Sequence, residues 1–438
     1  MTKIEHELTA LDALEAPPLE EDIRRRAASP TSVEFDPPTR SVGSRLLAGA
    51  TALILFAAVA TLAWRAFVPT GNGHPGTTPS PVPSVDPWAA YQEGWTELPA
   101  PPEPRVGGLV AWTGRELLLW GGRPDGGDEP ASGGFAFDPV DGTWRRLPDA
   151  PVGAEAFGDT PRPVWTGSEV LFYPAGFAFD PASDTWRALP RAPHDPGYRQ
   201  TAAVWTGSEL VVFGGGDVDS ETARQGAAYE PEADVWRSIA EAPIGLNLLS
   251  AAWTGDEVLV FGSLLNDRNI AETPNSVGAA YDPETDTWRE LPPSDLSPQA
   301  TSAVFAGDRL IAWDYEVRAQ EYDPTTDTWT PPDDMPMEFS ECYPDSVVAR
   351  DVVFAWFCGQ AATLDVDAGS WQRVRGGVLE PTIEANKQEY ALFRFASFAA
   401  AGDVVAMAAE GITVDDEGVP CYGCPGAPVS YWVYRPPS

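Results

Sequence analysis

The sequence predicts an all-β fold, a seven-bladed β-propeller that follows a single transmembrane helix. Three features of the 438 residues lead to this prediction. A motif that combines an acidic residue, a proline and a tryptophan recurs along the chain. A pair of apolar strands joined by a Thr-Gly turn recurs upstream of it. One uncharged span near the N-terminus matches the thickness of a bilayer. We expect four segments in chain order: a cytoplasmic segment at 1–45, a transmembrane helix at 46–66, a linker at 67–87 and the propeller at 88–438.

The predicted transmembrane helix rests on the nineteen uncharged residues from Leu46 to Trp64. As a helix they extend roughly 28 Å, close to the hydrocarbon thickness. A cleaved signal peptide is the alternative, but its apolar run is usually shorter and lies nearer the N-terminus. Five arginines precede the span and only Arg65 occurs in the forty residues after it. The positive-inside rule then predicts a single-pass protein of the cell membrane with a cytoplasmic N-terminus and an extracytoplasmic propeller.

The two segments beside the span have different compositions. Apolar residues recur at helical spacing in the cytoplasmic segment, at Ile4, Leu8, Leu11 and Leu14. This stripe predicts either a cytoplasmic partner of residues 1–45 or a weakly ordered tail that only sets the topology. The linker is rich in Pro, Gly, Ser and Thr, which is typical of an extended spacer.

The first repeated motif ends in tryptophan. Its copies are FDPVDGTW at 137–144, FDPASDTW at 179–186, YEPEADVW at 229–236, YDPETDTW at 281–288, YDPTTDTW at 322–329 and a worn LDVDAGSW at 364–371. Proline fixes φ for a turn, and the acidic side chain before it can cap that turn. The motif therefore indicates a hairpin between two strands, with the tryptophan opening the second of them.

The second repeated motif lies upstream of each of these. Its copies are AWTGRELLLWGG at 111–122, VWTGSEVLFYP at 164–174, VWTGSELVVFGGG at 204–216, AWTGDEVLVFG at 252–262, and the weaker VFAGDRLIAWD at 304–314 and ARDVVFAWF at 349–357. A Thr-Gly-x-Glu turn here joins a strand ending in an aromatic residue to a β-branched strand. Each repeat therefore contains four strands.

The period and the two ends of the repeat region predict a closed ring. The motif tryptophans from Trp95 to Trp371 are spaced by about 46 residues on average, as in a propeller blade. Residues 94–99 read as a fourth strand without the first three, whereas FASFAAAGDVVAMAAEG and SYWVYRPPS near the C-terminus read as three strands without a fourth. We expect the N-terminal strand to complete this last blade, which gives seven blades and no exposed edge.

On these residues the chain resembles the kelch-repeat family. Paired glycines follow two of the second strands, at Gly121-Gly122 and Gly214-Gly215, and an aromatic residue then precedes the tryptophan by seven positions. The resemblance covers residues 88–438, and the glycine pair is missing after Phe172, Phe261 and Trp313. It implies a propeller like the central domain of galactose oxidase.

One face of this ring is the predicted recognition surface. The Thr-Gly turns and the Asp-Pro turns leave one face and are nearly uniform. The connections on the other face vary strongly in length, and variable loops on a rigid scaffold are where recognition usually occurs. The candidate binding residues in these loops are Asp125, Asp128, Glu129, Asp217, Asp219, Glu221, Arg224, Asn266, Asp267 and Arg268.

The scarcity of histidine limits the chemistry that we expect. The kelch family includes a copper oxidase that needs histidine ligands, but His194 is the only histidine between residues 88 and 438. We therefore expect no catalytic residue, no metal site and no cofactor, and a binding, interaction or sensing module for an extracellular protein or glycan. The alternative is a propeller-type carbohydrate-active enzyme, an epimerase or a glycosidase, because carboxylates are abundant and their spacing is not visible in a sequence.

The cysteines and the charge fit an extracytoplasmic location. An even number of cysteines outside the cell favours disulfides. We expect one bond between Cys342 and Cys358, and a loop-closing bond between Cys421 and Cys424. The chain has 65 acidic and 28 basic residues, a formal charge of −37. This charge opposes nucleic-acid binding, which depends on clustered cations.

Overall fold

The computed structural model describes residues 86–437 apart from 125–130, 152–162, 174, 194–200, 215–220, 264–274, 299–300, 340–343, 381, 386–387, 415–419 and 423–427. The chain divides into two compact units, Met1–Val82 and Pro83–Ser438, and every described residue belongs to the second. No helix in this described part is long and apolar enough to cross a bilayer. The predicted cytoplasmic segment, transmembrane helix and most of the linker lie outside the described residues, so they stay predictions.

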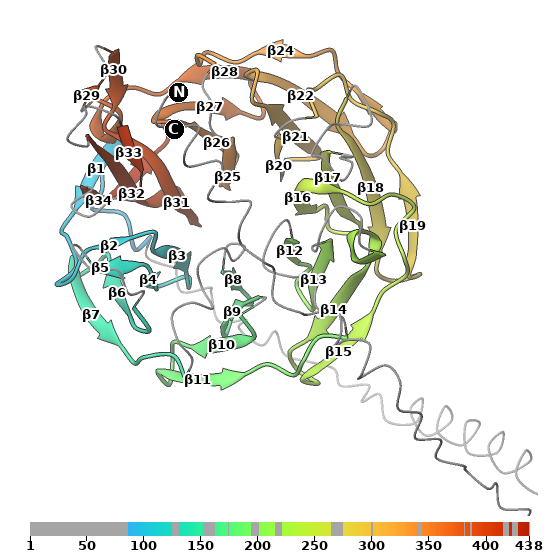
Figure 1. The fold of residues 1–438 in the computed structure, drawn as a ribbon, viewed down its shortest axis with the longest axis horizontal. Coiled ribbons are helices and arrows are strands. Elements are labelled where there is room, and N and C mark those ends of the chain that lie inside the picture. Colours follow the sequence, from blue (N-terminus) through green and yellow to red (C-terminus); the bar gives the residue numbers. More distant parts are fainter. Residues whose placement is uncertain are drawn as a thin grey trace, which may run out of the picture. The chain divides into compact units, whose positions relative to one another are not determined.

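Seven antiparallel sheets form a ring, which confirms the predicted propeller (Figure 1). In blades 1 to 6 the first strand in chain order lies innermost and the fourth lies outermost (Figure 1). Blade 1 consists of β3 (Leu109–Trp112), β4 (Leu117–Trp120), β6 (Gly134–Asp138) and β7 (Thr143–Leu147). Blade 2 consists of β8 (Val164–Trp165), β9 (Val170–Phe172), β10 (Phe177–Asp180) and β11 (Thr185–Ala188). Blade 3 consists of β12 (Thr201–Trp205), β13 (Leu210–Gly214), β14 (Gly226–Glu230) and β15 (Val235–Ser238). Blade 4 consists of β16 (Asn247–Trp253), β17 (Val258–Ser263), β18 (Val277–Asp282) and β19 (Thr287–Glu290). Blade 5 consists of β20 (Thr301–Ala306), β21 (Arg309–Asp314), β22 (Arg318–Asp323) and β23 (Thr328–Trp329). Blade 6 consists of β25 (Asp345–Ala349), β26 (Val352–Phe357), β27 (Gln360–Asp365) and β28 (Ser370–Arg373).

Blade 7 combines the two ends of the propeller, as predicted. It consists of β31 (Phe393–Ala401), β32 (Val404–Val414), β34 (Val429–Arg435) and β1 (Gly94–Leu98). The last two strands pair antiparallel from Gly94 opposite Arg435 to Leu98 opposite Tyr431. Arg435 also donates from Nη2 to Asp86 Oδ2 at 2.8 Å and to the Trp88 carbonyl at 2.7 Å. The strand pairing and this clamp hold the entering and leaving ends of the chain together.

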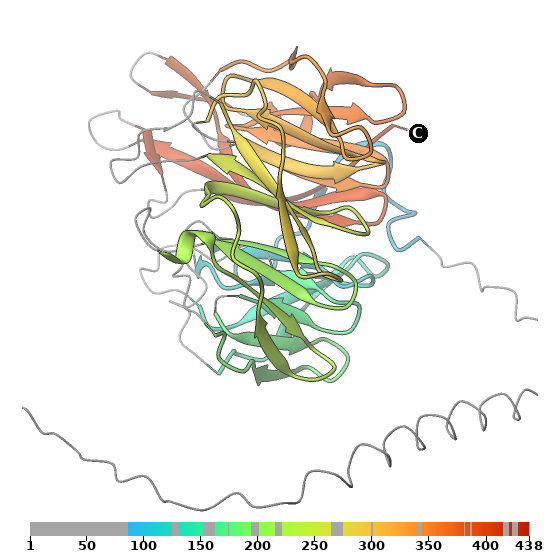
Figure 2. The same cartoon turned by 90° about the vertical axis from the view of Figure 1, so that its right-hand side faces the viewer.

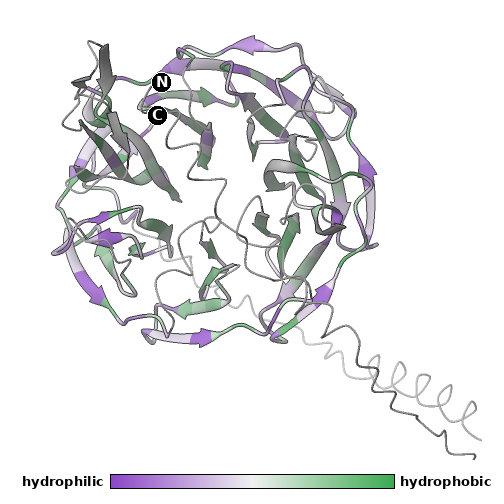
Figure 3. Ribbon diagram, in the orientation of Figure 1, coloured by the Kyte–Doolittle hydropathy of each residue, from purple (hydrophilic) through white to green (hydrophobic). Residues whose placement is uncertain are grey.

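The hydropathy of each strand follows its radial position. The second strands are continuous apolar runs, and Leu117–Trp120 and Leu210–Gly214 are buried throughout because neighbouring blades cover both of their faces. The fourth strands carry exposed and half-buried residues, as in Thr185–Ala188. Figure 3 shows hydrophilic residues along the outer strands and hydrophobic ones further inside.

The core is a set of layers between adjacent blades. Leu118 and Trp120 of blade 1 pack with Val170 and Phe172 of blade 2, and Val211 and Phe213 of blade 3 pack in the same way with strands of blade 4. Five of the motif tryptophans lie at the outer rim of such a layer, and the indole Nε1 of each donates to a backbone carbonyl at the end of the preceding blade. These bonds run from Trp144 to Pro99 at 2.6 Å, Trp186 to Pro148 at 3.2 Å, Trp236 to Pro190 at 2.9 Å, Trp288 to Ala240 at 2.8 Å and Trp329 to Pro292 at 2.8 Å. The repeated tryptophans therefore join successive blades.

The two faces of the ring, which Figure 2 shows from its edge, differ in their connections. We call the face with the Thr-Gly and Asp-Pro turns the turn face and the opposite one the loop face. Thr113 Oγ1 accepts from the Glu116 N–H at 3.0 Å, and Gly114 between them has a φ of 82°, which favours glycine. Asp138 Oδ1 accepts from the Val140 N–H at 2.8 Å, the capping contact predicted for the Asp-Pro turn. Both turns recur in successive blades.

Several short elements escaped the sequence analysis. They are β2 (Arg105–Val106) paired with β5 (Arg123–Pro124), β24 (Asp333–Asp334) beside β22, β29 (Thr382–Ala385) paired with β30 (Gln388–Ala391), β33 (Pro420–Tyr422) beside β32, and the 3-10 turns η2 (Glu221–Arg224) and η3 (Gly377–Leu379). Segments of two to four residues are too short to show a periodicity, so pairing rather than sequence pattern defines them.

Deleting residues 86–98 from the full chain should lower the free energy of unfolding by at least about 5 kcal/mol, because the deletion unpairs β34 and removes the buried Trp88 and Leu98. Urea denaturation followed by tryptophan fluorescence measures the change. Deletion of residues 70–82 is the length-matched control and should leave the midpoint unchanged. Equal midpoints for both deletions would show that ring closure by β1 contributes nothing.

Candidate functional site

A ladder of arginines joins neighbouring blades at the outer edge of the turn face. The arginine follows the motif tryptophan, as in Arg145, whose Nε and Nη2 donate to Glu116 of its own blade, each at 2.8 Å. Its Nη1 donates to Asp184 of the next blade at 2.8 Å. The arginine thus binds the glutamate of its own Thr-Gly-x-Glu turn and the last aspartate of the next Asp-Pro turn. Arg187, Arg237 and Arg289 bind Glu169, Glu209 and Glu257 in the same way.

A tyrosine completes this ladder in blades 3 to 5. Arg187 Nη1 donates to the Tyr229 hydroxyl at 2.9 Å, and that hydroxyl donates to Asp234 Oδ1 at 2.6 Å. Tyr281 with Asp286 and Tyr322 with Asp327 repeat the arrangement at 2.8 Å and 2.6 Å. These aspartates adopt a positive φ, near 54° at Asp234, which aspartate tolerates better than most residues. The turn conformation therefore aims the carboxylate at the neighbouring blade.

The ladder shifts the ionisation of its members. The hydrogen bonds that Arg145, Arg187 and Arg289 donate to the carboxylates of Glu116, Glu169 and Glu257 raise the pKa of these arginines. Burial raises the pKa of Tyr229, Tyr281 and Tyr322 to about 12, and the aspartate beside each hydroxyl adds to the shift. The arginines stay charged and the tyrosines stay neutral over the physiological range.

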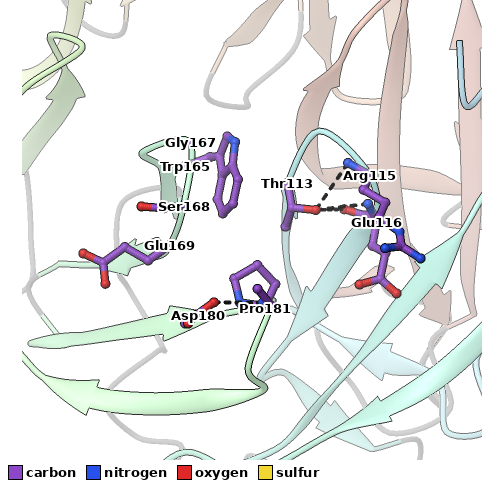
Figure 4. A pocket seen from close by; sticks show the side chains of 10 residues that line it. Thr113, Arg115, Glu116, Trp165, Gly167, Ser168, Glu169, Asp180 and Pro181 are labelled. Atoms are coloured by element: carbon purple, nitrogen blue, oxygen red, sulfur yellow. Dashed lines mark hydrogen bonds between the residues drawn. The ribbon is translucent and has the colours of Figure 1, made fainter. Parts of the chain in front are cut away.

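Between blades 1 and 2 the turn face is hollowed by a pocket of about 550 Å³, which we call the indole hollow. Blade 1 contributes Thr113, Arg115 and Glu116, and blade 2 contributes Trp165, Ser168, Glu169, Asp180 and Pro181. The Trp165 ring and Pro181 face Thr113 across this space (Figure 4). The volume lies in the range of small-molecule sites.

The electrostatics of the indole hollow are balanced by the ladder. Glu116 and Glu169 point to their arginine partners at 2.8 Å and 2.5 Å. Asp180 accepts from the Ala182 N–H at 2.8 Å and the Ser183 hydroxyl at 2.7 Å, and these bonds hold its pKa below the usual range. Arg115 forms no ion pair within the described part of the chain. An aromatic face, hydroxyls, one guanidinium and one carboxylate without ion pairs, and two glutamates paired with arginines suit an uncharged polar ligand.

A second hollow of about 300 Å³ lies at the same place between blades 3 and 4. Trp253 takes the position of Trp165, and Thr206 that of Thr113. Ser208 replaces Arg115, whereas Asp256 and Glu284 replace Ser168 and Ala182. The repeat builds the same shape twice and fills the variable turn positions with different charges.

Most of the predicted binding residues lie outside the described residues. This applies to Asp125, Asp128, Glu129, Asp217, Asp219, Asn266, Asp267 and Arg268. The backbone of Glu221 belongs to η2. Arg224 ends η2 and donates from Nε to the Ala242 carbonyl at 2.8 Å, close to Glu241 at 3.2 Å. Arg224 therefore links η2 to the connection that leads to blade 4. The binding site on the loop face stays a prediction.

The cysteine predictions are tested at one residue. Cys358 is disulfide-bonded. It lies just after the second strand of blade 6: β26 stops at Phe357, because Cys358 and Gly359 take positive φ values of 53° and 75° and form a two-residue hairpin turn. Cys342 and Cys424 lie outside the described residues, and the bond between Cys421 and Cys424 stays a prediction, as does the choice of Cys342 as partner.

Sequence reasoning missed the indole hollow because it treated the uniform turns as structural only. The available signal was the third position of the Thr-Gly-x-Glu turn, which changes from Arg115 to Ser168, Ser208 and Asp256 while its neighbours stay constant. Among the described residues, no group of three or more His, Cys, Asp or Glu side chains is arranged to hold a metal ion.

Arg289→Ala should lower the free energy of unfolding by about 1 kcal/mol, a modest value because the guanidinium is one-third exposed and solvent screens its ion pairs. Arg373→Ala is the control, since Arg373 lies at the outer edge of blade 6 with only weaker contacts, a 3.8 Å contact to Glu338 and a 3.4 Å hydrogen bond to Gln360. Chemical denaturation of both variants gives the comparison. Equal costs for the two substitutions would contradict a stabilising ladder.

The ladder tyrosines should make the protein sensitive to alkali. An unfolded tyrosine ionises near pH 10, whereas Tyr281 in the fold has a pKa of about 12. Between these values the unfolded chain releases a proton that the folded chain keeps, so the free energy of unfolding falls as the pH rises. This contribution is fully present below about pH 10.

Tyr281→Phe should make the free energy of unfolding fall less steeply with pH in this window. The double variant Tyr281→Phe with Tyr322→Phe should reduce this slope by about twice as much as the single variant. Melting temperatures and phenolate absorbance measured together from neutral to strongly alkaline pH test this expectation. Melting temperatures of wild type and double variant that fall equally over this pH range would refute it.

Comparison with known proteins adds no relative: no protein-family model matches the chain, and no curated protein matches its sequence.

Proposed function

We propose that this chain is a binding module, a kelch-type propeller anchored in the cell membrane by residues 46–66 and exposed outside the cell. The observation that supports binding most strongly is the indole hollow, a space of about 550 Å³ in which an indole ring lies among hydroxyl and charged groups already fixed by hydrogen bonds. Such preorganised concave surfaces bind ligands at low entropic cost. The kelch assignment rests on the glycine pairs and the spacing of the tryptophans.

The proposed ligand is a neutral glycan. A sugar presents a weakly polar C–H face to an aromatic ring and hydroxyls to hydrogen-bonding groups at its rim. Trp165 offers the ring, while Arg115, Ser168 and Asp180 offer donors and acceptors around it. A polyanion is disfavoured, because 55 of the 65 acidic residues lie in residues 88–438.

Trp165→Ala should weaken glycan binding at least tenfold, because the substitution removes the ring surface of the indole hollow. Calorimetric titration with a hit from a panel of neutral and acidic oligosaccharides measures the affinity. Trp205→Ala is the matched control: Trp205 also ends an innermost strand and packs between blades 2 and 3, but it does not line the indole hollow.

Three outcomes separate the candidates. Loss of binding in Trp165→Ala with retention in Trp205→Ala supports the indole hollow. Equal affinities for both variants and wild type would move the site elsewhere, first to the loop face. Turnover of the bound oligosaccharide would favour the carbohydrate-active enzyme, and a propeller that binds no member of the panel would favour a protein ligand. Protease treatment of intact cells tests the topology, because a protected propeller would contradict an extracytoplasmic location.

A further inference from the structure

A carboxyl group interrupts the apolar face of blade 7. Along β32 the alternate residues Val404, Ala406 and Ala408 point to blade 1 and belong to the core layer between these blades. Glu410 is the next residue on that face, and it pairs with Val429 of β34. The two-residue period of the strand thus places a carboxylate where the pattern demands an apolar side chain.

The carboxylate lines a cavity of about 190 Å³ at the seam between blades 7 and 1, which we call the seam cavity. Its apolar walls are formed by Leu109, Ala396, Ala408 and Val429. Side-chain oxygens come from Ser397 of β31 and Glu410 of β32. Gly107 and Gly108 close it from the segment after β2. A Cβ at Gly108 would come within 2.7 Å of the Leu119 side chain, so a larger residue there would displace it.

The negative charge of the Glu410 carboxylate is only partly compensated by its surroundings. Its Oε2 accepts one hydrogen bond, from the Gly107 N–H at 3.0 Å, and no ion pair to it occurs among the described residues. Burial raises the pKa of Glu410, opposed by that hydrogen bond and by the charge of Arg123. The other ionisable groups around the cavity are Arg105 in its lining and Tyr431 on the same face of β34, whose hydroxyl accepts from the Arg105 N–H at 2.9 Å. A carboxylate that is partly desolvated and forms no ion pair gains most from a cationic ligand.

We propose that the seam cavity binds a primary ammonium group carried on a short alkyl chain, as in a lysine side chain or a free alkylamine. The ammonium donates to Glu410, and the apolar walls cover the methylene groups behind it. The volume equals that of about six water molecules, enough for the end of such a chain. The negative charge of the propeller raises the local concentration of any cation.

The experiment titrates the full-length protein with n-butylammonium and follows the ¹³C resonance of the Glu410 carboxyl, with n-butanol as the uncharged probe of equal length. The ammonium should shift the resonance and saturate, whereas the alcohol should bind at least tenfold more weakly. Binding should also weaken as the pH falls through the raised pKa of Glu410, because a proton and the ammonium compete for the same carboxylate. Equal affinities for amine and alcohol in the wild-type protein would overturn the proposal without any substitution.

Two variants and two further probes complete the test. Glu410→Gln keeps the acceptor for Gly107 and should lose at least tenfold in affinity, whereas Glu290→Gln, an exposed carboxyl on β19, should not change it. N-acetyl-lysine methylamide and its side-chain-acetylated form distinguish a lysine side chain from a free amine as the source. Trp165→Ala should leave ammonium binding intact, so failure of the indole hollow and failure of the seam cavity are observed separately. Glu410→Gln binding the amine like wild type would refute the assignment.

Discussion

No blade of this ring can bury its own faces. The second strands, such as Leu117–Trp120, are apolar on both sides, and each side is covered only when a neighbouring blade packs against it. Burial of apolar surface therefore acts between repeats rather than within them, and the free energy gained at each layer depends on the presence of the next. A linear array of such blades would leave two apolar faces and two strand edges exposed. Closure by Gly94–Leu98 removes this cost, and the contacts between blades depend on the closed ring.

The polar contacts at the rim set how the blades meet. Apolar layers tolerate small slips, but a tryptophan N–H that must reach a carbonyl of the preceding blade, and an arginine that must reach two carboxylates on different blades, fix one arrangement. The ladder runs from Arg145 to Arg289 and stops in blade 5, where Thr330 follows the motif tryptophan. Blades 6 and 7 are joined instead by the ion pair between Arg350 and Asp403. The first half of the ring is thus the more regular one, and both inter-blade hollows described above lie within it.

The indole hollow is a by-product of this regularity. Two adjacent turns, a tryptophan from the innermost strand and a proline from the Asp-Pro turn all belong to the repeat, and together they leave a concave space between blades 1 and 2 and between blades 3 and 4. Because Arg145 and Arg187 already bind the glutamates of its walls, the walls are rigid and close to neutral. The charge and polarity of each hollow are then set by the turn residues that vary between repeats, such as Arg115 in one and Ser208 in the other. The seam cavity arises differently, since it lies where the repeat is broken by closure and where Glu410 departs from the apolar pattern of β32. Departures from a local pattern that the fold tolerates are frequent at functional sites.

The sequence alone determined the class of fold, the number of blades, the shared last blade and the position of every motif tryptophan in a fourth strand. It could do so because turn chemistry and strand periodicity are local, and because the same local pattern recurs until only a ring satisfies it. The pairing of Trp95 with Tyr434 confirms the most distant of these inferences. The tertiary structure decided what lies between blades. That Arg187 meets both Glu169 and Tyr229, that Trp165 faces Thr113 across a space, and that Glu410 lies in an apolar seam all depend on residues from different repeats. Their distances follow from the radius and twist of the closed ring, and no spacing within a single repeat encodes them.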